Sequence, residues 1–145
     1  MNLSENVKVT TALDYASGSA DRNGATLDMQ GYEGVLMIVK LAAVATGAVT
    51  SIKAQQDSAS GMGTAADLAG TGQTIADDDD NQVFIIDLYQ PQERYVRLVV
   101  DKDGTNAVAE SAIYVQYGPR SLPVSNNVTD AVTTEKHISP AEGTA

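Results

Sequence analysis

Apolar and polar residues alternate with a period of two along several short segments of this chain. The alternation begins at residues 7–10, where two valines are separated by Lys8, and it returns over residues 25–30. Because successive side chains of a strand point to opposite faces, this spacing predicts strands with one buried and one solvated face. Asn23 and Gly24, directly before the second segment, predict a tight turn.

Longer apolar segments predict the interior of the fold. Residues 35–39 are Val-Leu-Met-Ile-Val without a polar interruption, which favours a strand buried on both faces. Alternating or β-branched segments predict further strands over residues 49–55, 83–89, 95–100 and 112–117. In the last of these strands, Ile113 and Val115 share one face and Tyr114 lies on the other.

These segments add up to about seven or eight short strands with turn residues between them, a pattern typical of antiparallel sandwiches and barrels. No strand–helix–strand rhythm is present in the sequence. The predicted fold class is therefore all-β, an antiparallel β-sandwich and within that class a jelly roll. Residues 1–118 form the predicted sandwich domain.

Two segments depart from the strand pattern. Residues 57–80 are rich in Gly, Ala, Ser, Thr and Asp, which predicts a long excursion with one short strand near Thr74 and Ile75. Residues 119–145 contain few large apolar side chains and cannot bury enough surface to offset their ordering entropy. They are predicted to form an extended C-terminal arm that is ordered along a partner.

The charge balance limits the classes of partner. The chain of 145 residues has a formal net charge of −10, which argues against nucleic acid and favours basic patches on a protein. No segment approaches the roughly 20 apolar residues of a membrane span, so no membrane partner is predicted. The N-terminus lacks the pattern of a signal peptide, and synthesis in the cytoplasm of the producing cell is expected.

The sequence offers little for catalysis. There is no cysteine, and the single histidine, His137, lies in the predicted arm, where a general base would lack fixed geometry. We therefore expect no enzymatic activity, no cofactor and no small-molecule substrate.

An acidic run is the one candidate for a metal. Consecutive carboxylates suit Ca²⁺, but their spacing does not match the EF-hand loop, and adjacent side chains of an extended run point to opposite sides. The interpretation favoured here is an acidic turn before a strand. The weak metal candidates are Asp77, Asp78, Asp79 and Asp80.

Contacts with a partner are predicted at two places. Arg94, Tyr95 and Arg97 combine charge with an aromatic ring, either as a contact patch or as a strand entry with surface ion pairs. The second place is the start of the arm, with Pro119, Arg120, Leu122 and Val124.

Five segments of the chain resemble small virion proteins of tailed bacteriophages. They are NGATLDMQGYEGV (23–35), IKAQQ (52–56), PQERYVR (91–97), QYGPR (116–120) and SPAEGTA (139–145). The resemblance covers most of the chain from residue 23 onward, and its motifs are structural rather than catalytic.

The family that this resemblance indicates is that of capsid decoration, or cement, proteins. It implies a dimer or trimer on the outer surface of the virion, bound to the phage major capsid protein across the seams between its subunits. It also implies synthesis in the host bacterial cytoplasm. Two alternatives stay open: a head-fibre, head–tail or tail component, and a calcium-dependent glycan-binding β-sandwich.

Overall fold

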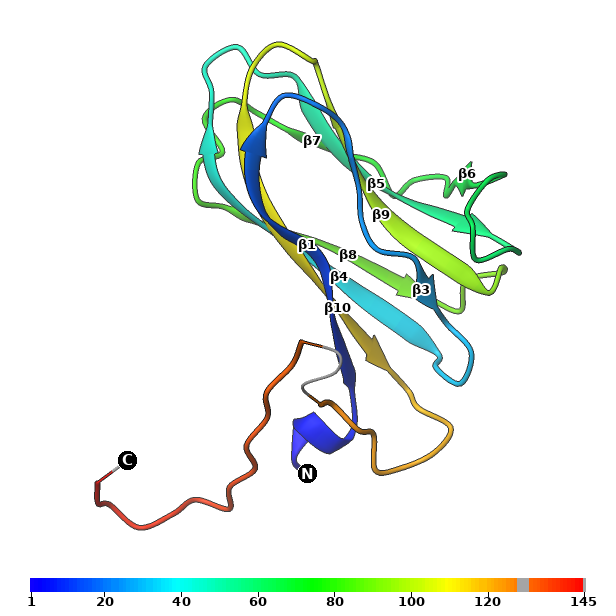
Figure 1. Cartoon of the computed structure of the whole chain (residues 1–145), viewed down its shortest axis with the longest axis vertical. Coiled ribbons are helices and arrows are strands. Elements are labelled where there is room, and N and C mark those ends of the chain that lie inside the picture. The colour runs from blue at the N-terminus through cyan, green and yellow to red at the C-terminus, as the bar shows by residue number, and fades with distance from the viewer. Residues whose placement is uncertain (128–130, 145) are drawn as a thin grey trace.

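The computed structural model describes residues 1–127 and 131–144, and Figure 1 shows a β-structure with an extended C-terminal segment. A short 3-10 helix, η1 (Leu3–Glu5), precedes the strands. The strands are β1 (Lys8–Gly18), β2 (Arg22–Asn23), β3 (Leu27–Asp28), β4 (Gly34–Val44), β5 (Thr50–Asp57), β6 (Ala66–Asp67), β7 (Gln73–Ile75), β8 (Val83–Tyr89), β9 (Tyr95–Lys102) and β10 (Val108–Tyr117).

The strands form two antiparallel sheets. The first sheet has the order β1-β10-β4-β8. The second sheet has β9 and β5 at its centre, and each of its edges is split into two short strands: β2 and β3 pair with β9, and β6 and β7 pair with β5. The predicted antiparallel β-sandwich is confirmed.

The strand pairs are nested along the chain. If each split edge is counted as one strand, the first strand pairs with the last, the second with the seventh, the third with the sixth and the fourth with the fifth. One long hairpin folded over into two sheets gives this order. The N-terminus and the loops between the long strands therefore lie at the two ends of the sandwich (Figure 1).

Alternate residues of both sheets fill one core between them. Val35, Met37 and Val39 of β4 are fully buried, and they share the core cluster with Leu98 and Ile52 of the second sheet. At roughly 25 cal/mol per Å² of buried apolar surface, this layer supplies the main driving force for folding.

Residues 35–39 differ from their prediction. The structure buries only one face of this run, because Leu36 and Ile38 lie half-buried on the outer face of the first sheet. The run is uninterrupted because the outer face of this strand is also apolar, and the strand is not enclosed on both sides.

The excursion after β5 is more ordered than predicted. The short strand near Thr74 and Ile75 is confirmed as β7, and β6 adds a second pairing with the same strand, β5. Asp57 fastens the intervening loop, because its carboxylate accepts hydrogen bonds from the backbone N–H groups of Ala59 and Thr64. These hydrogen bonds hold the pKa of Asp57 below its usual value.

Tyr114 joins the two sheets through the core. Its hydroxyl accepts a hydrogen bond from the N–H of Leu98 (2.8 Å) and donates one to the carbonyl of Ala25 (2.9 Å). A Cβ at Gly24 would lie 2.5 Å from this hydroxyl, so the position requires glycine. Burial raises the pKa of Tyr114 to about 12, which keeps the hydroxyl protonated and able to donate.

A buried ionic network makes a second connection between the sheets. Glu110 of β10 contacts Lys102 of β9 through Oε2 and Arg22 of β2 through Oε1, each at 2.8 Å. The Lys102 and Glu110 side chains are completely buried. The Lys102 ammonium donates hydrogen bonds to the carbonyls of Gly18 and Val108. Glu110 Oε2 accepts no hydrogen bond, and the nearby positive charge of Lys102 balances its negative charge.

Replacing Tyr114 tests the connection through the core. Tyr114→Phe leaves the N–H of Leu98 and the carbonyl of Ala25 without this partner, and we expect the free energy of unfolding to fall by about 1–3 kcal/mol. Tyr15→Phe is the control, because Tyr15 is 67% exposed and its change should stay within about 0.5 kcal/mol. Denaturant unfolding measures both, and equal effects would contradict the role of Tyr114.

Candidate functional site

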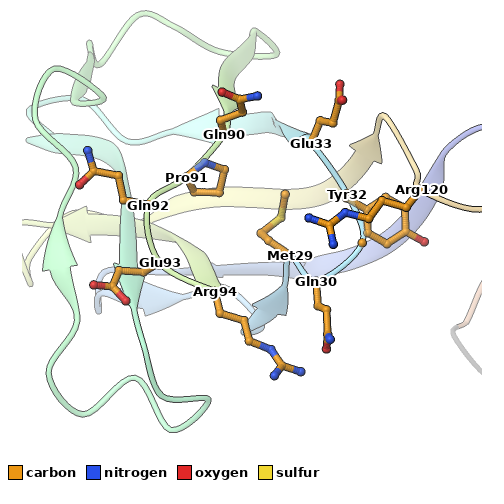
Figure 2. Close-up of a pocket in the computed structure, with 11 residues that line it drawn as sticks. Met29, Gln30, Tyr32, Glu33, Gln90, Pro91, Gln92, Glu93, Arg94 and Arg120 are labelled. Atoms are coloured by element: carbon orange, nitrogen blue, oxygen red, sulfur yellow. The ribbon is translucent and has the colours of Figure 1, made fainter.

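A cleft of about 560 Å³ lies at one end of the sandwich. Its walls are the turn from β3 to β4 (residues 29–33), the turn from β8 to β9 (residues 90–94) and the side chain of Arg120 (Figure 2). Both turns lie between strands of different sheets, so the sandwich holds them in place. Two of the predicted contact residues, Arg94 and Arg120, are brought together here although 26 positions separate them in the sequence (120 − 94).

Arg94 is engaged within its own chain. Its guanidinium forms a two-pronged contact with Asp28, with Nε–Oδ1 at 2.9 Å and Nη2–Oδ2 at 2.7 Å. The guanidinium also lies 5.2 Å from the centre of the Tyr95 ring. The Arg94 hydrogen bond lowers the pKa of Asp28, and Asp28 raises that of Arg94. Both side chains are about half exposed, so the pair fixes the wall of the cleft and adds little to stability.

Arg120 is the cation available to a ligand in this cleft. Its backbone N–H donates to the carbonyl of Gly31 (2.9 Å), which fixes the start of the arm against the β3–β4 turn. Its side chain is exposed and lies at the cleft in Figure 2. Across residues 1–127 and 131–144, no ion pair of its guanidinium is present. Glu33 and Glu93 also line the cleft, so it presents charges of both signs and is suited to a polar loop of a partner protein.

Arg97, which was predicted to form one contact patch with Arg94 and Tyr95, lies outside the cleft. Arg97 is on the outer face of the second sheet, where its Nε donates to the side-chain oxygen of Gln55 (2.9 Å). Tyr95 begins β9 and is half-buried. The sequence segment therefore divides into a cleft residue, Arg94, and a residue of a polar sheet surface, Arg97.

The first part of the arm is fastened to the N-terminal segment. Val124 is buried, and its N–H donates to the carbonyl of Glu5 (2.8 Å). Asn126 donates from Nδ2 to the carbonyls of Ser4 and Val7, and its Oδ1 accepts from the N–H of Val9. The remaining predicted residues of this part differ in exposure: Pro119 is half-buried, and Leu122 is 61% exposed.

The second part of the arm runs over the outside of the molecule. Residues 131–144 form no helix or strand, and all of them except Val132 are exposed. Lys136 contacts Glu5 of η1 at 2.7 Å, and the N–H of Val132 donates to the carbonyl of Asn127 (3.2 Å). Ile138 is 92% exposed. Figure 1 shows this segment leading away from the sandwich; residues 128–130 and 145 of the predicted arm lie outside the described residues.

The acidic run caps a turn. Asp77 accepts a hydrogen bond from the N–H of Gly47, Asp80 from Val44 and Asp79 from Ala76, each at 2.8 Å. Two of the four carboxylates therefore hold the turn between β4 and β5. Within the part of the chain that the structure describes, no group of three or more His, Cys, Asp or Glu side chains is arranged to hold a metal ion.

The single histidine lies on the exposed arm. His137 Nε2 is 3.1 Å from the carboxylate of Glu135, two residues away. Both side chains are more than half exposed, so no fixed catalytic geometry surrounds the imidazole. Over the described residues, no helix is long and apolar enough to cross a membrane.

The sequence predictions missed one surface, the outer face of the first sheet. Register places Ile113, Ile38 and Ile85 side by side across three strands, and all three point away from the core. Two features of the sequence point to this surface. The run 35–39 has apolar residues on both faces of its strand, and Ile113 and Val115 lie on the face of their strand opposite to Tyr114.

Comparisons with known proteins add no relative. No protein-family model matches this chain, and no curated protein matches it at a significant level. The functional argument therefore rests on the residues and their geometry.

The acidic run gives a test of the calcium alternative. We expect millimolar calcium to shift the melting temperature by less than about 1 °C, because a ligand stabilises only as far as it binds the folded state. Asp80→Ala should cost about 0.5–1.5 kcal/mol through the lost hydrogen bond to Val44. Asp78→Ala is the matched control, with a change within about 0.5 kcal/mol. A calcium shift of several degrees that Asp80→Ala removes would contradict this interpretation.

Proposed function

We propose that this protein is a non-enzymatic virion structural protein that binds the outer surface of a phage capsid and reinforces contacts between major capsid subunits. The sequence resemblance to decoration proteins motivates this proposal. The anchored arm is the observation that carries it.

The arm begins at a fixed place on the domain and continues as an exposed segment that is available to a partner. Asn126 and Val124 hold its first part on η1 and β1, so the exposed part starts from a defined place on a rigid body. A segment that buries almost nothing against its own domain gains its order from a partner. An extended segment of 14 residues (131–144) can span up to about 46–50 Å, so it can contact a partner surface well away from its anchor.

Repetition on a shell makes weak contacts sufficient. Each arm would gain little from a few exposed side chains such as Ile138 and Lys136, and the sandwich would add contacts at the cleft around Arg120. Linking two modest contacts through one rigid body raises the effective concentration of the second. This mode of binding needs no catalytic residue, no metal and no membrane.

Particle association with counting of copies tests the proposal. Purified protein is mixed with tailed-phage shells that lack it, the shells are sedimented, and the bound copies per particle are counted. We expect saturation at a copy number that matches a symmetry axis of the shell. A few copies per particle would instead indicate a fibre, head–tail or tail component, and the absence of binding would overturn the proposal.

Removing the exposed part of the arm tests its role. Truncation after Asn127 keeps the anchor residues Val124 and Asn126, so the melting temperature should change by less than about 2 °C, while the affinity for shells falls at least about tenfold. Truncation after Gly118 is the informative comparison, because it also removes the anchor and should lower the stability of the sandwich. Normal decoration by the chain truncated after Asn127 would contradict the role of the arm.

A further inference from the structure

The outer face of the first sheet is mostly apolar. One row consists of Thr11, Ile113, Ile38 and Ile85, and the next consists of Val9, Val115, Leu36 and Asp87. Ile113 is 41% exposed, Ile85 48% and Val83 52%. A contiguous apolar surface of this kind on a monomer is typical of an interaction site.

The outer face of the second sheet, on the other side of the sandwich, is polar and not apolar. On the outer face of the second sheet, Lys53 lies 3.0 Å from both Asp67 and Asp101, and Arg97 is bound to Gln55. That surface has the polar, ion-paired character of a solvated sheet. The two outer faces therefore differ in what they are suited to contact.

Charge on the apolar face is confined to two positions. Over the paired residues 9–11, 34–40, 83–89 and 111–117, the outward-pointing charged side chains are Lys40 and Asp87. Lys40 pairs with Val83 in the row on one side of the isoleucine row, and Asp87 pairs with Leu36 in the row on the other side. On a chain with a net charge of −10, this face carries one charge of each sign.

We infer that this face binds the same face of a second copy of the chain. A two-fold axis lying in the interface along the isoleucine row places that row on itself and exchanges the two rows beside it. Lys40 of one copy then lies above Leu36 of the other, one strand from Asp87. The long Lys40 side chain can cover the spacing of one strand to Asp87, once on each side of the axis.

The two charges are free to make this contact. Lys40 donates one hydrogen bond to the carbonyl of Asn81, and Asp87 accepts one from the Tyr117 hydroxyl (2.7 Å). An ammonium has three donors and a carboxylate accepts several bonds, so each keeps capacity for a partner. The face is thus complementary to itself in charge.

The size of the face sets the strength of the association. Four strands about 4.8 Å apart and seven residues of about 3.3 Å each cover roughly 440 Å². Two copies would bury roughly 900 Å², below the 1,200–2,000 Å² of stable interfaces, so we expect a weak dimer whose population depends on protein concentration. The inference does not depend on capsid binding, because it concerns the purified protein alone.

Sedimentation equilibrium of the purified protein tests the interface. The wild-type protein should shift from monomer toward dimer as its concentration rises from roughly 1 to 500 µM, the range in which an interface too small for nanomolar affinity associates. Ile113→Lys should weaken dimerisation at least about tenfold, because it places a charge at the axis. Val49→Lys is the matched control: Val49 is a 70% exposed apolar residue outside this face, and its substitution should leave the association unchanged.

A charge exchange tests the two-fold arrangement itself. Lys40→Glu and Asp87→Lys should each weaken the dimer, since each places like charges together, and the double variant should restore it. Melting temperatures establish that each variant is folded. A wild-type protein that stays monomeric at 500 µM would overturn the inference, and so would association that Ile113→Lys leaves intact. Additive losses without restoration would overturn the two-fold arrangement.

Discussion

The fold depends on polar groups that are buried between the sheets and satisfied across them. Glu110 reaches Lys102 and Arg22 from the opposite sheet, and the Tyr114 hydroxyl serves Leu98 and Ala25. An unpaired hydroxyl in this place would cost about 1–3 kcal/mol and an unpaired charge about 3–5 kcal/mol, so a shift of one sheet along the other is penalised. These contacts therefore fix one register of the first sheet on the second.

Fixing the sheets also fixes what each outer surface presents. The second sheet shows ion pairs to solvent, the first shows an apolar field with Lys40 and Asp87 at its margins, and the turns at one end close around the cleft near Arg120. The arm begins from the same rigid body through Asn126. A protein that works by adhesion needs this combination of defined surfaces and one adaptable segment.

Much of the fold was predictable because period-two alternation is a local signal. Which face of β10 is buried was not predictable. By composition Ile113 is the more apolar side chain, but Tyr114 is buried because its hydroxyl finds hydrogen-bond partners 16 and 89 residues away. The buried Lys102–Glu110 pair is hidden for the same reason. Of the candidate contacts, Arg94 and Arg120 meet in one cleft, whereas Arg97 lies on a sheet surface, and only tertiary structure separates them.

Hydrogen–deuterium exchange of the free and shell-bound protein tests most directly whether the anchored arm is the adhesive element. The account predicts that the amides of residues 131–144, which are exposed and without regular structure in the free chain, become protected on the shell, while those of the core strands β4 and β9 stay unchanged. Equal exchange of residues 131–144 in both states, with protection confined to the sandwich, would contradict it.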